Sequence, residues 1–381
     1  MVGPGFVIVN PEGKNIHVHA GRRSASVLGG NPGAGAVRAP TRAWFAASRT
    51  RTTIHLAAVR STLGRALTRP GPSAKTESEA MRTILASSII WWAALAPAPA
   101  SAADVPYAIA DWTVEGWGNS RARVAVEAKA GVVRLHLPWR RRDEMPERKA
   151  IFVVDAATGK RLANVVTVRA TRESGDVLFQ PATAPGEYFV YYMPFKTEGS
   201  WYFPSVRYLT PADTAEPAWA AACKQAADAI REGKPCDLPA ARLIEFQAVN
   251  DFHRFDPMEV IATAGETKAL LAAHAGAAFL LFGEDRRHPI RMSDDLPLRW
   301  IQAGPGRTLR GEACRGEFYA FQVGLWACGQ DLRDVSVRFS ELAGPGGGSI
   351  PVSALRCFNV GGTDWLGRAF RKTLHVPRGK V

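Results

Sequence analysis

The chain has 381 residues, of which 46% are hydrophobic, and a formal net charge of +13. This length suits two or three domains with packed cores. The charge is uneven: residues 1–80 hold 11 Lys or Arg against 3 Glu and no Asp, whereas residues 83–381 hold 36 basic and 32 acidic residues. A charge of +4 on the longer part argues against a phosphate-binding surface, so we expect no nucleic-acid partner.

Residues 1–80 show no sustained helical or strand period and are rich in Ala, Arg, Gly, Ser and Thr. We predict no packed structure there. One interpretation is a disordered basic extension or an organellar transit peptide. The other is that translation normally starts at Met81, so that residues 1–80 are an N-terminal extension assigned in error.

Residues 81–103 have the three parts of a secretory signal peptide. Met81, Arg82 and Thr83 form a positive start, an apolar run covers Ile84–Leu95, and the small residues at its end fit an A-x-A cleavage pattern. The run is shorter than the ~20 residues that a transmembrane helix needs. We therefore expect export to the periplasm, the cell surface or the medium, and no membrane-spanning segment in the mature chain.

Residues 104–210 have the pattern of β-strands. Apolar residues recur at every second position over 122–128 and over 133–139, the period of a strand with one buried face. Further short apolar runs follow, separated by Gly, Asp and Pro turns. This spacing predicts an antiparallel β-sandwich, and the chain as a whole is predicted to be mainly β.

Residues 211–303 contain helical patterns and form a predicted α/β segment. A helix is expected over Ala218–Glu232, ended by Gly233. A second begins at Thr263, where Glu266 three residues later completes a capping box, and runs to about His274. An apolar strand is expected directly after it.

Residues 304–381 return to the β period, with alternation over 319–325 and 335–339. We predict a second β-sandwich domain. Since the strands run out at residue 381 without a closing element, this domain is expected to be truncated, and no catalytic barrel is expected in the chain.

All five cysteines follow the predicted signal peptide and would meet an oxidising compartment. Cys223 and Cys236 bracket a helix end and a Gly-Lys-Pro turn, which makes them the disulfide candidate. Cys314, Cys328 and Cys357 allow one further pair, and the pairing stays open. No Cys/His group has zinc-ligand spacing, so neither a metal nor a cofactor is predicted.

The sequence offers two adjacent acidic pairs, Asp143-Glu144 and Glu284-Asp285, but no G-x-S-x-G or H-E-x-x-H motif. A catalytic acid needs a pKa raised by burial or by a like charge. Both pairs stand next to arginines in stretches that are predicted to be solvated charged loops. No catalytic residue is therefore predicted.

Residues 250–256 place Asp251, His253 and Asp256 within seven positions, which makes a metal site conceivable. Alternation favours another interpretation: Phe252 and Phe255 anchor the segment, and the polar residues form turn hydrogen bonds. We favour the interpretation as a turn anchored by the two phenylalanines.

Two groups near loop signals are candidate carbohydrate contacts: Trp201 with Tyr202, and Asp364 with Trp365. Aromatic rings stack on sugar faces while polar neighbours fix the hydroxyls, as in other small-ligand sites. Most aromatic residues of a β-sandwich belong to its core, and this alternative applies to each of them.

Several segments resemble a known family. Three of them are Gly-Glu-Phe-Tyr-Ala-Phe-Gln-Val-Gly-Leu-Trp-Ala from Gly316, Val-Ser-Val-Arg-Phe-Ser from Val335, and Arg-Cys-Phe-Asn-Val-Gly-Gly-Thr-Asp-Trp-Leu-Gly-Arg from Arg356. They look like the N-terminal β-sandwich region of glycoside hydrolase family 123-type proteins. The block Val133–Phe195 resembles the upstream β region of large members.

The resemblance implies an exported glycosidase of the β-N-acetylgalactosaminidase type, in which an adjacent Asp-Glu pair on a following (β/α)₈ barrel supports substrate-assisted catalysis. This chain stops before such a barrel, so no catalytic residue is carried over. The expected function is a non-catalytic front part of such a protein, with a glycan as partner. The alternatives are a stand-alone carbohydrate-binding or adhesion module and, less favoured, a surface scaffold; the oligomeric state is not predicted.

Overall fold

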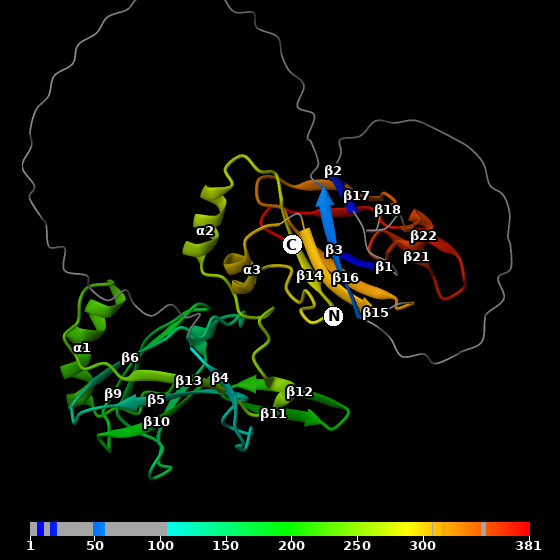
Figure 1. The fold of residues 1–381 in the computed structure, drawn as a ribbon. Helices are drawn as coiled ribbons and strands as arrows, with labels where there is room; N and C mark the ends of the chain where they lie inside the picture. The colour runs from blue at the N-terminus through cyan, green and yellow to red at the C-terminus, as the bar shows by residue number, and fades with distance from the viewer. Residues whose placement is uncertain are drawn as a thin grey trace, which may run out of the picture. The chain divides into compact units, whose positions relative to one another are not determined.

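The computed structural model describes the backbone of residues 6–10, 16–20 and 49–57, and residues 105–306, 308–314, 316–343 and 348–381 in full (Figure 1). The predicted signal peptide lies outside the described residues. No helix in the described ranges is long and apolar enough to cross a membrane.

The first β-sandwich consists of a five-stranded sheet, in the order β4-β13-β5-β10-β7, and a three-stranded sheet, in the order β6-β9-β8. Neighbouring strands are antiparallel except β13 and β4. The predicted antiparallel sandwich is therefore confirmed. Its strands are β4 (Tyr107–Ile109), β5 (Ser120–Val126), β6 (Val133–Leu137), β7 (Ile151–Asp155), β8 (Val165–Ala170), β9 (Gly175–Phe179), β10 (Gly186–Tyr192) and β13 (Arg242–Ala248).

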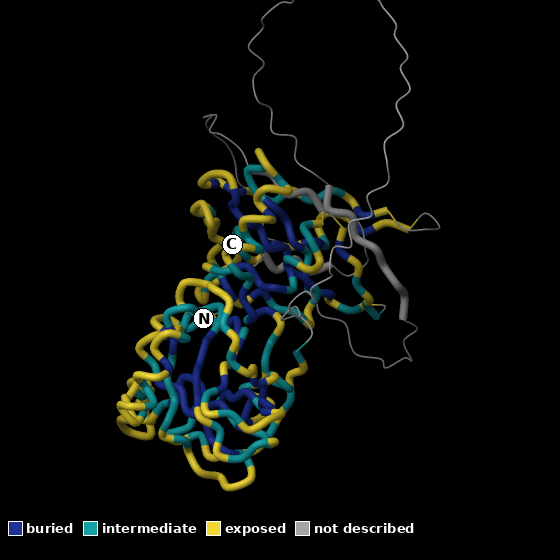
Figure 2. Tube along the Cα trace, turned by 90° about the vertical axis from the view of Figure 1, so that its left-hand side faces the viewer, coloured by how far each residue is buried: buried dark blue, intermediate teal, exposed yellow. Residues whose placement is uncertain are grey.

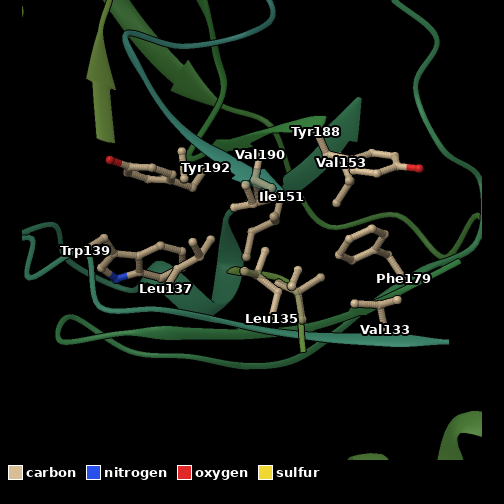
Figure 3. Close-up of a cluster of buried hydrophobic side chains, with 14 of the residues drawn as sticks. Val133, Leu135, Leu137, Trp139, Ile151, Val153, Phe179, Tyr188, Val190 and Tyr192 are labelled. Atoms are coloured by element: carbon tan, nitrogen blue, oxygen red, sulfur yellow. The ribbon is translucent and has the colours of Figure 1, made fainter. Parts of the chain in front are cut away.

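The core of this sandwich lies between the two sheets (Figure 3). Side chains of β6 and Trp139 face those of β7 and β10, as the alternation of apolar residues predicts. Trp139 is 2% exposed and its ring centroid lies 5.1 Å from that of Tyr192. The Trp139 ring also covers Gly175, where a Cβ atom would come within 2.3 Å of Cη2. Only glycine leaves room for the indole at this position of β9.

A hairpin and a helix complete this part of the chain. Strands β11 (Phe195–Ser200) and β12 (Phe203–Tyr208) pair with each other in a two-stranded sheet. Helix α1 (Pro217–Arg231) agrees with the predicted helix and packs Cys223 and Ala227 against Val168 and Leu178 of the small sheet. The helix therefore belongs to the first sandwich.

The middle of the chain contains α2 (Ala264–Ala273), β14 (Leu280–Asp285) and α3 (Leu298–Ala303). The capping box is present: Thr263 Oγ1 accepts from the N–H of Glu266, and Glu266 accepts from the N–H of Thr263. Strand β14 pairs with β16 of the C-terminal sheet. Short 3-10 helices are η2 (Pro146–Arg148), η3 (Asp251–His253) and η4 (Val352–Ala354).

The C-terminal part contains a four-stranded sheet, β14-β16-β1-β20, and a five-stranded sheet, β15-β3-β2-β17-β23. Figure 2 shows buried stretches inside this part as in the first sandwich. Its strands are β1 (Phe6–Asn10), β2 (Ile16–Ala20), β3 (Arg49–Ala57), β15 (Thr308–Cys314), β16 (Tyr319–Trp326), β17 (Leu332–Phe339), β20 (Arg356–Cys357) and β23 (Leu374–Val376). Two short ribbons join β18 (Leu342–Ala343) to β19 (Ser349–Ile350), and β21 (Gly361–Thr363) to β22 (Ala369–Arg371).

Strands β1, β2 and β3 differ from the prediction that residues 1–80 lack packed structure. Strand β1 lies between β16 and β20, and β3 pairs with β15 along the whole of β15. Their sequences FVIVN, IHVHA and RTRTTIHLA are rich in β-branched residues, which favour strands. Composition averaged over 80 residues hides such short runs. The other residues of 1–80 lie outside the described part.

Candidate functional site

The aromatic residues predicted to contact carbohydrate are exposed. Trp201 and Tyr202 lie between β11 and β12 and are 87% and 78% exposed. Their ring centroids are 4.9 Å apart with the rings almost perpendicular, at 82°. Carbohydrate contact at this tip stays a prediction.

The second pair lies between β21 and β22. Trp365 is 90% exposed. The Asp364 carboxylate accepts hydrogen bonds from the backbone N–H groups of Leu366 and Arg368, at 2.9 and 2.8 Å. Asp364 therefore stabilises the turn that presents the Trp365 ring. The structure does not bring this pair into contact with Trp201 and Tyr202 among the described residues.

Glu284 corrects the prediction of a solvated charged loop. It lies in β14, is 4% exposed, and its Oε1 accepts from Trp300 Nε1 at 2.9 Å and from Arg299 Nε at 3.1 Å. Burial alone would raise the pKa of Asp285, but hydrogen bonds from Arg287 hold this pKa below its ordinary value. Both carboxylates are held in place by neighbours, and Asp285 lacks the raised pKa of a general acid.

The other acidic pair, Asp143-Glu144, follows three consecutive arginines. Asp143 is partly buried and accepts from Arg141 Nε at 3.0 Å, whereas Glu144 is exposed. The prediction of a solvated loop therefore fits Glu144 but not Asp143, which lines a cavity.

Residues 250–256 form a turn around η3. The Asn250 side chain accepts from the backbone N–H of His253, and Asp256 pairs with Arg291 at 3.1 Å. In the ranges that the structure describes, no group of three or more His, Cys, Asp or Glu could hold a metal ion.

The two phenylalanines of this turn behave differently. Phe255 packs against the first core, 4.4 Å from Tyr107 between ring centroids, as predicted for an anchor. Phe252 is 89% exposed, so its prediction as an anchor is wrong. Residues three apart point to opposite faces of a strand, and in this turn only Phe255 packs against the core.

The structure holds Cys223 and Cys236 as free thiols, and their pairing as a disulfide stays a prediction. Cys223 is 1% exposed and faces the small sheet from the buried side of α1. Cys236 lies in the loop beyond the helix end.

The described structure contains at least two cavities. The larger, about 580 Å³, lies between α1 and strands β7 and β8, with a mainly aliphatic lining. The smaller, about 240 Å³, is lined by Asn119, by residues 139–143 and by residues 252–256, 259 and 260. The sequence prediction missed this second site because its residues come from three separate stretches. Local sequence signals for the smaller cavity are limited to the run Arg140-Arg-Arg and to the aromatic residue beside a histidine at 252–253.

Residues 110–249 match the family model described as "Glycoside hydrolase 123, N-terminal domain". The matched range spans the first sandwich from β5 to β13, with the hairpin and α1, and includes the block Val133–Phe195. It does not extend to Gly316–Val381. No curated protein and no solved structure matches the chain.

Proposed function

We propose that this chain is a non-catalytic, glycan-directed part of an exported glycosidase-like protein, because residues 110–249 match the model of the glycoside hydrolase 123 N-terminal domain. The match of this domain is the observation that carries the proposal. The resemblance to β-N-acetylgalactosaminidases makes a glycan that contains N-acetylgalactosamine the first candidate ligand.

The described carboxylates support a non-catalytic role. Glycoside hydrolysis commonly uses a pair of carboxyl groups on either side of the scissile bond, one of them an acid with a raised pKa. Glu284 is buried beneath Arg299 and Trp300, Asp285 accepts from Arg287, and Asp143 accepts from Arg141. Each of these groups is already committed to a structural partner.

The test of this proposal has two parts on the full chain. With an aryl N-acetyl-β-galactosaminide we expect no release of the aryl alcohol above the blank, and turnover would overturn the non-catalytic assignment. On a glycan array we expect binding. An array without any bound glycan would overturn the glycan-directed role.

The alternative function is a stand-alone carbohydrate-binding or adhesion module, favoured by the exposure of Trp201 and Trp365. An exposed ring contributes little to folding, so Trp201→Ala and Trp365→Ala should leave the fold intact. Loss of array binding in either variant would favour this alternative, and unchanged binding in both would remove these rings from the site.

Export is also proposed, on the signal-peptide pattern of residues 81–103. Expression in a secreting host should give an exported protein whose N-terminal sequence begins just after Ala100 or Ala102. A protein retained in the cytoplasm with residues 81–103 attached would contradict export.

A further inference from the structure

The smaller cavity combines three loops at one edge of the first sandwich. Asn119 precedes β5, residues 139–143 follow β6, and residues 252–260 follow β13. Its volume of about 240 Å³ lies just below the ~300–1,000 Å³ of sites for drug-sized ligands. It can therefore receive one small ring and not an extended chain.

Cations exceed anions around this cavity. Its three carboxylates are each neutralised by a guanidinium: Asp143 by Arg141 at 3.0 Å, Asp256 by Arg291 at 3.1 Å, and Glu259 by Arg142 at 3.1 Å. Arg254 also lines the cavity and has no ion pair within the described residues. This leaves one planar guanidinium with its donors available to an anion.

Arg140 adds a buried cation to the wall. It is 7% exposed, and its two terminal nitrogens donate to Glu266 at 2.7 and 2.9 Å. Its Nε is shielded from solvent and has no hydrogen-bond partner. Because Glu266 neutralises its charge, Arg140 contributes a fixed wall with one unpaired Nε–H donor, and the unpaired positive charge of the cavity is that of Arg254.

Neutral donors lie beside these cations. The Asn119 Nδ2 atom lies 3.0 Å from His253 Nδ1. When the Asn119 amide N–H donates to Nδ1, the imidazole proton is on Nε2. Burial, and then the charge of Arg141, lower the pKa of His253, which keeps the ring neutral at neutral pH. The ring can then donate from Nε2–H to a hydroxyl group.

An exposed aromatic ring completes the site. Phe252 lines the cavity, is 89% exposed, and has its ring centroid 5.0 Å from that of His253, at 90°. An aromatic face beside planar polar groups suits a ring that is apolar on one face and carries hydroxyls at its edge. A monosaccharide has this form.

We propose that this cavity binds a single sugar unit that carries an oxyanion, either a carboxylate or a sulfate. Arg254 binds the oxyanion through two of its N–H groups, Phe252 stacks on the ring, and Asn119 and His253 bind hydroxyls. This inference rests on the proposed glycan-directed function and names its site and ligand class.

Calorimetric titration of the full chain tests the ligand class. The probes are methyl glucuronide, methyl glucoside as its neutral parent, sulfated N-acetylgalactosamine, N-acetylgalactosamine, and sodium sulfate. We expect at least one charged sugar to bind at least tenfold more tightly than its neutral parent, and the one that does so identifies the oxyanion. Equal affinity for charged and neutral sugars would overturn the proposal, and so would free sulfate binding as tightly as the sugars.

Variants test the position of the site. Arg254→Ala should weaken binding of the charged sugar at least tenfold, since a charge-assisted pair is lost, and should leave its neutral parent unchanged. Phe252→Ala should weaken the binding of both the charged sugar and its neutral parent. Arg333→Ala, an exposed arginine of β17 without an ion pair among the described residues, is the matched control and should bind as the wild type does.

The outcomes separate this inference from the proposed function. A chain that binds array glycans as well in Arg254→Ala and Phe252→Ala as in the wild type would retain its glycan-directed function, but the cavity would not be the site. A chain that binds neither array glycans nor the titrated sugars would overturn both.

Discussion

Replacing Trp139 by Ala is expected to lower the free energy of unfolding of the first sandwich by about 3–5 kcal/mol, the usual cost of removing a large buried aromatic side chain. The Trp139 ring is 2% exposed, contacts Tyr192 and Gly175, and donates from Nε1 to the carbonyl of Thr171 at 2.9 Å. Hydrogen exchange of the β6 and β9 amides under native conditions measures the loss directly. Trp201→Ala, which removes an 87% exposed indole, is the control and should change it by less than about 0.5 kcal/mol.

A substitution at Gly175 also tests its contact with the Trp139 ring. Gly175→Ala should cost about 1–3 kcal/mol in the wild-type background, because its Cβ would overlap the indole. In the Trp139→Ala background the overlap is gone and the cost should largely vanish, which gives a coupling energy in a double-mutant cycle. Additive effects would show that the two residues do not meet. Gly131→Ala, with no atom within 4 Å of the added Cβ, is the control for a glycine replacement.

The Glu266→Gln variant is expected to lose about 3 kcal/mol, because it leaves the charge of Arg140 buried without its counter-ion. The side chains of Arg140 and Glu266 are 8% and 29% exposed, and the pair is bidentate. The carboxylate also accepts from the N–H of Thr263 at the start of α2. Hydrogen exchange of the α2 amides reports the change. Glu198→Gln in the hairpin, whose partner Arg207 is 70% exposed, should cost less than about 1 kcal/mol.

The pH dependence of this loss follows from the carboxyl of Glu266. Burial alone would raise its pKa, but hydrogen bonds from Arg140 and from the N–H of Thr263 hold the pKa below the ordinary value of 4.5. The stabilisation is therefore complete above about pH 4.5 and is lost as the pH falls through the lower pKa of the folded state. Wild type and Glu266→Gln should differ most at neutral pH and converge in acid. A difference that stays constant down to pH 3 would contradict the role of this charge.

Local patterns in the sequence predicted the parts of the fold that local interactions determine. The alternation over 133–139 identifies the core face of β6, and the Thr263–Glu266 spacing identifies the start of α2. Pairing between distant strands has no such signal. The position of β14 beside β16, which buries Glu284 under Trp300, depends on residues far apart in the chain.

The candidate site divides in the same way. Exposure of Trp201 and Trp365 could be predicted from neighbouring turn residues. The cavity could not, because Asn119, Arg254 and the loop after β6 meet only once the sandwich has formed. The burial of Cys223 has a related cause: the helix face that it occupies is determined by the sheet against which α1 packs.

Strands β1, β2 and β3 complete the C-terminal sheets, yet they precede the predicted signal-peptide cleavage site. A cut after Ala102 would separate all three strands from the chain that follows, although β1 lies between β16 and β20, and β3 and β2 lie between β15 and β17. A processed chain that released them would expose the hydrogen-bonding edges of β15, β16 and β17 for another strand to occupy. Processing at this position would thus convert an internally paired surface into an acceptor for strand addition.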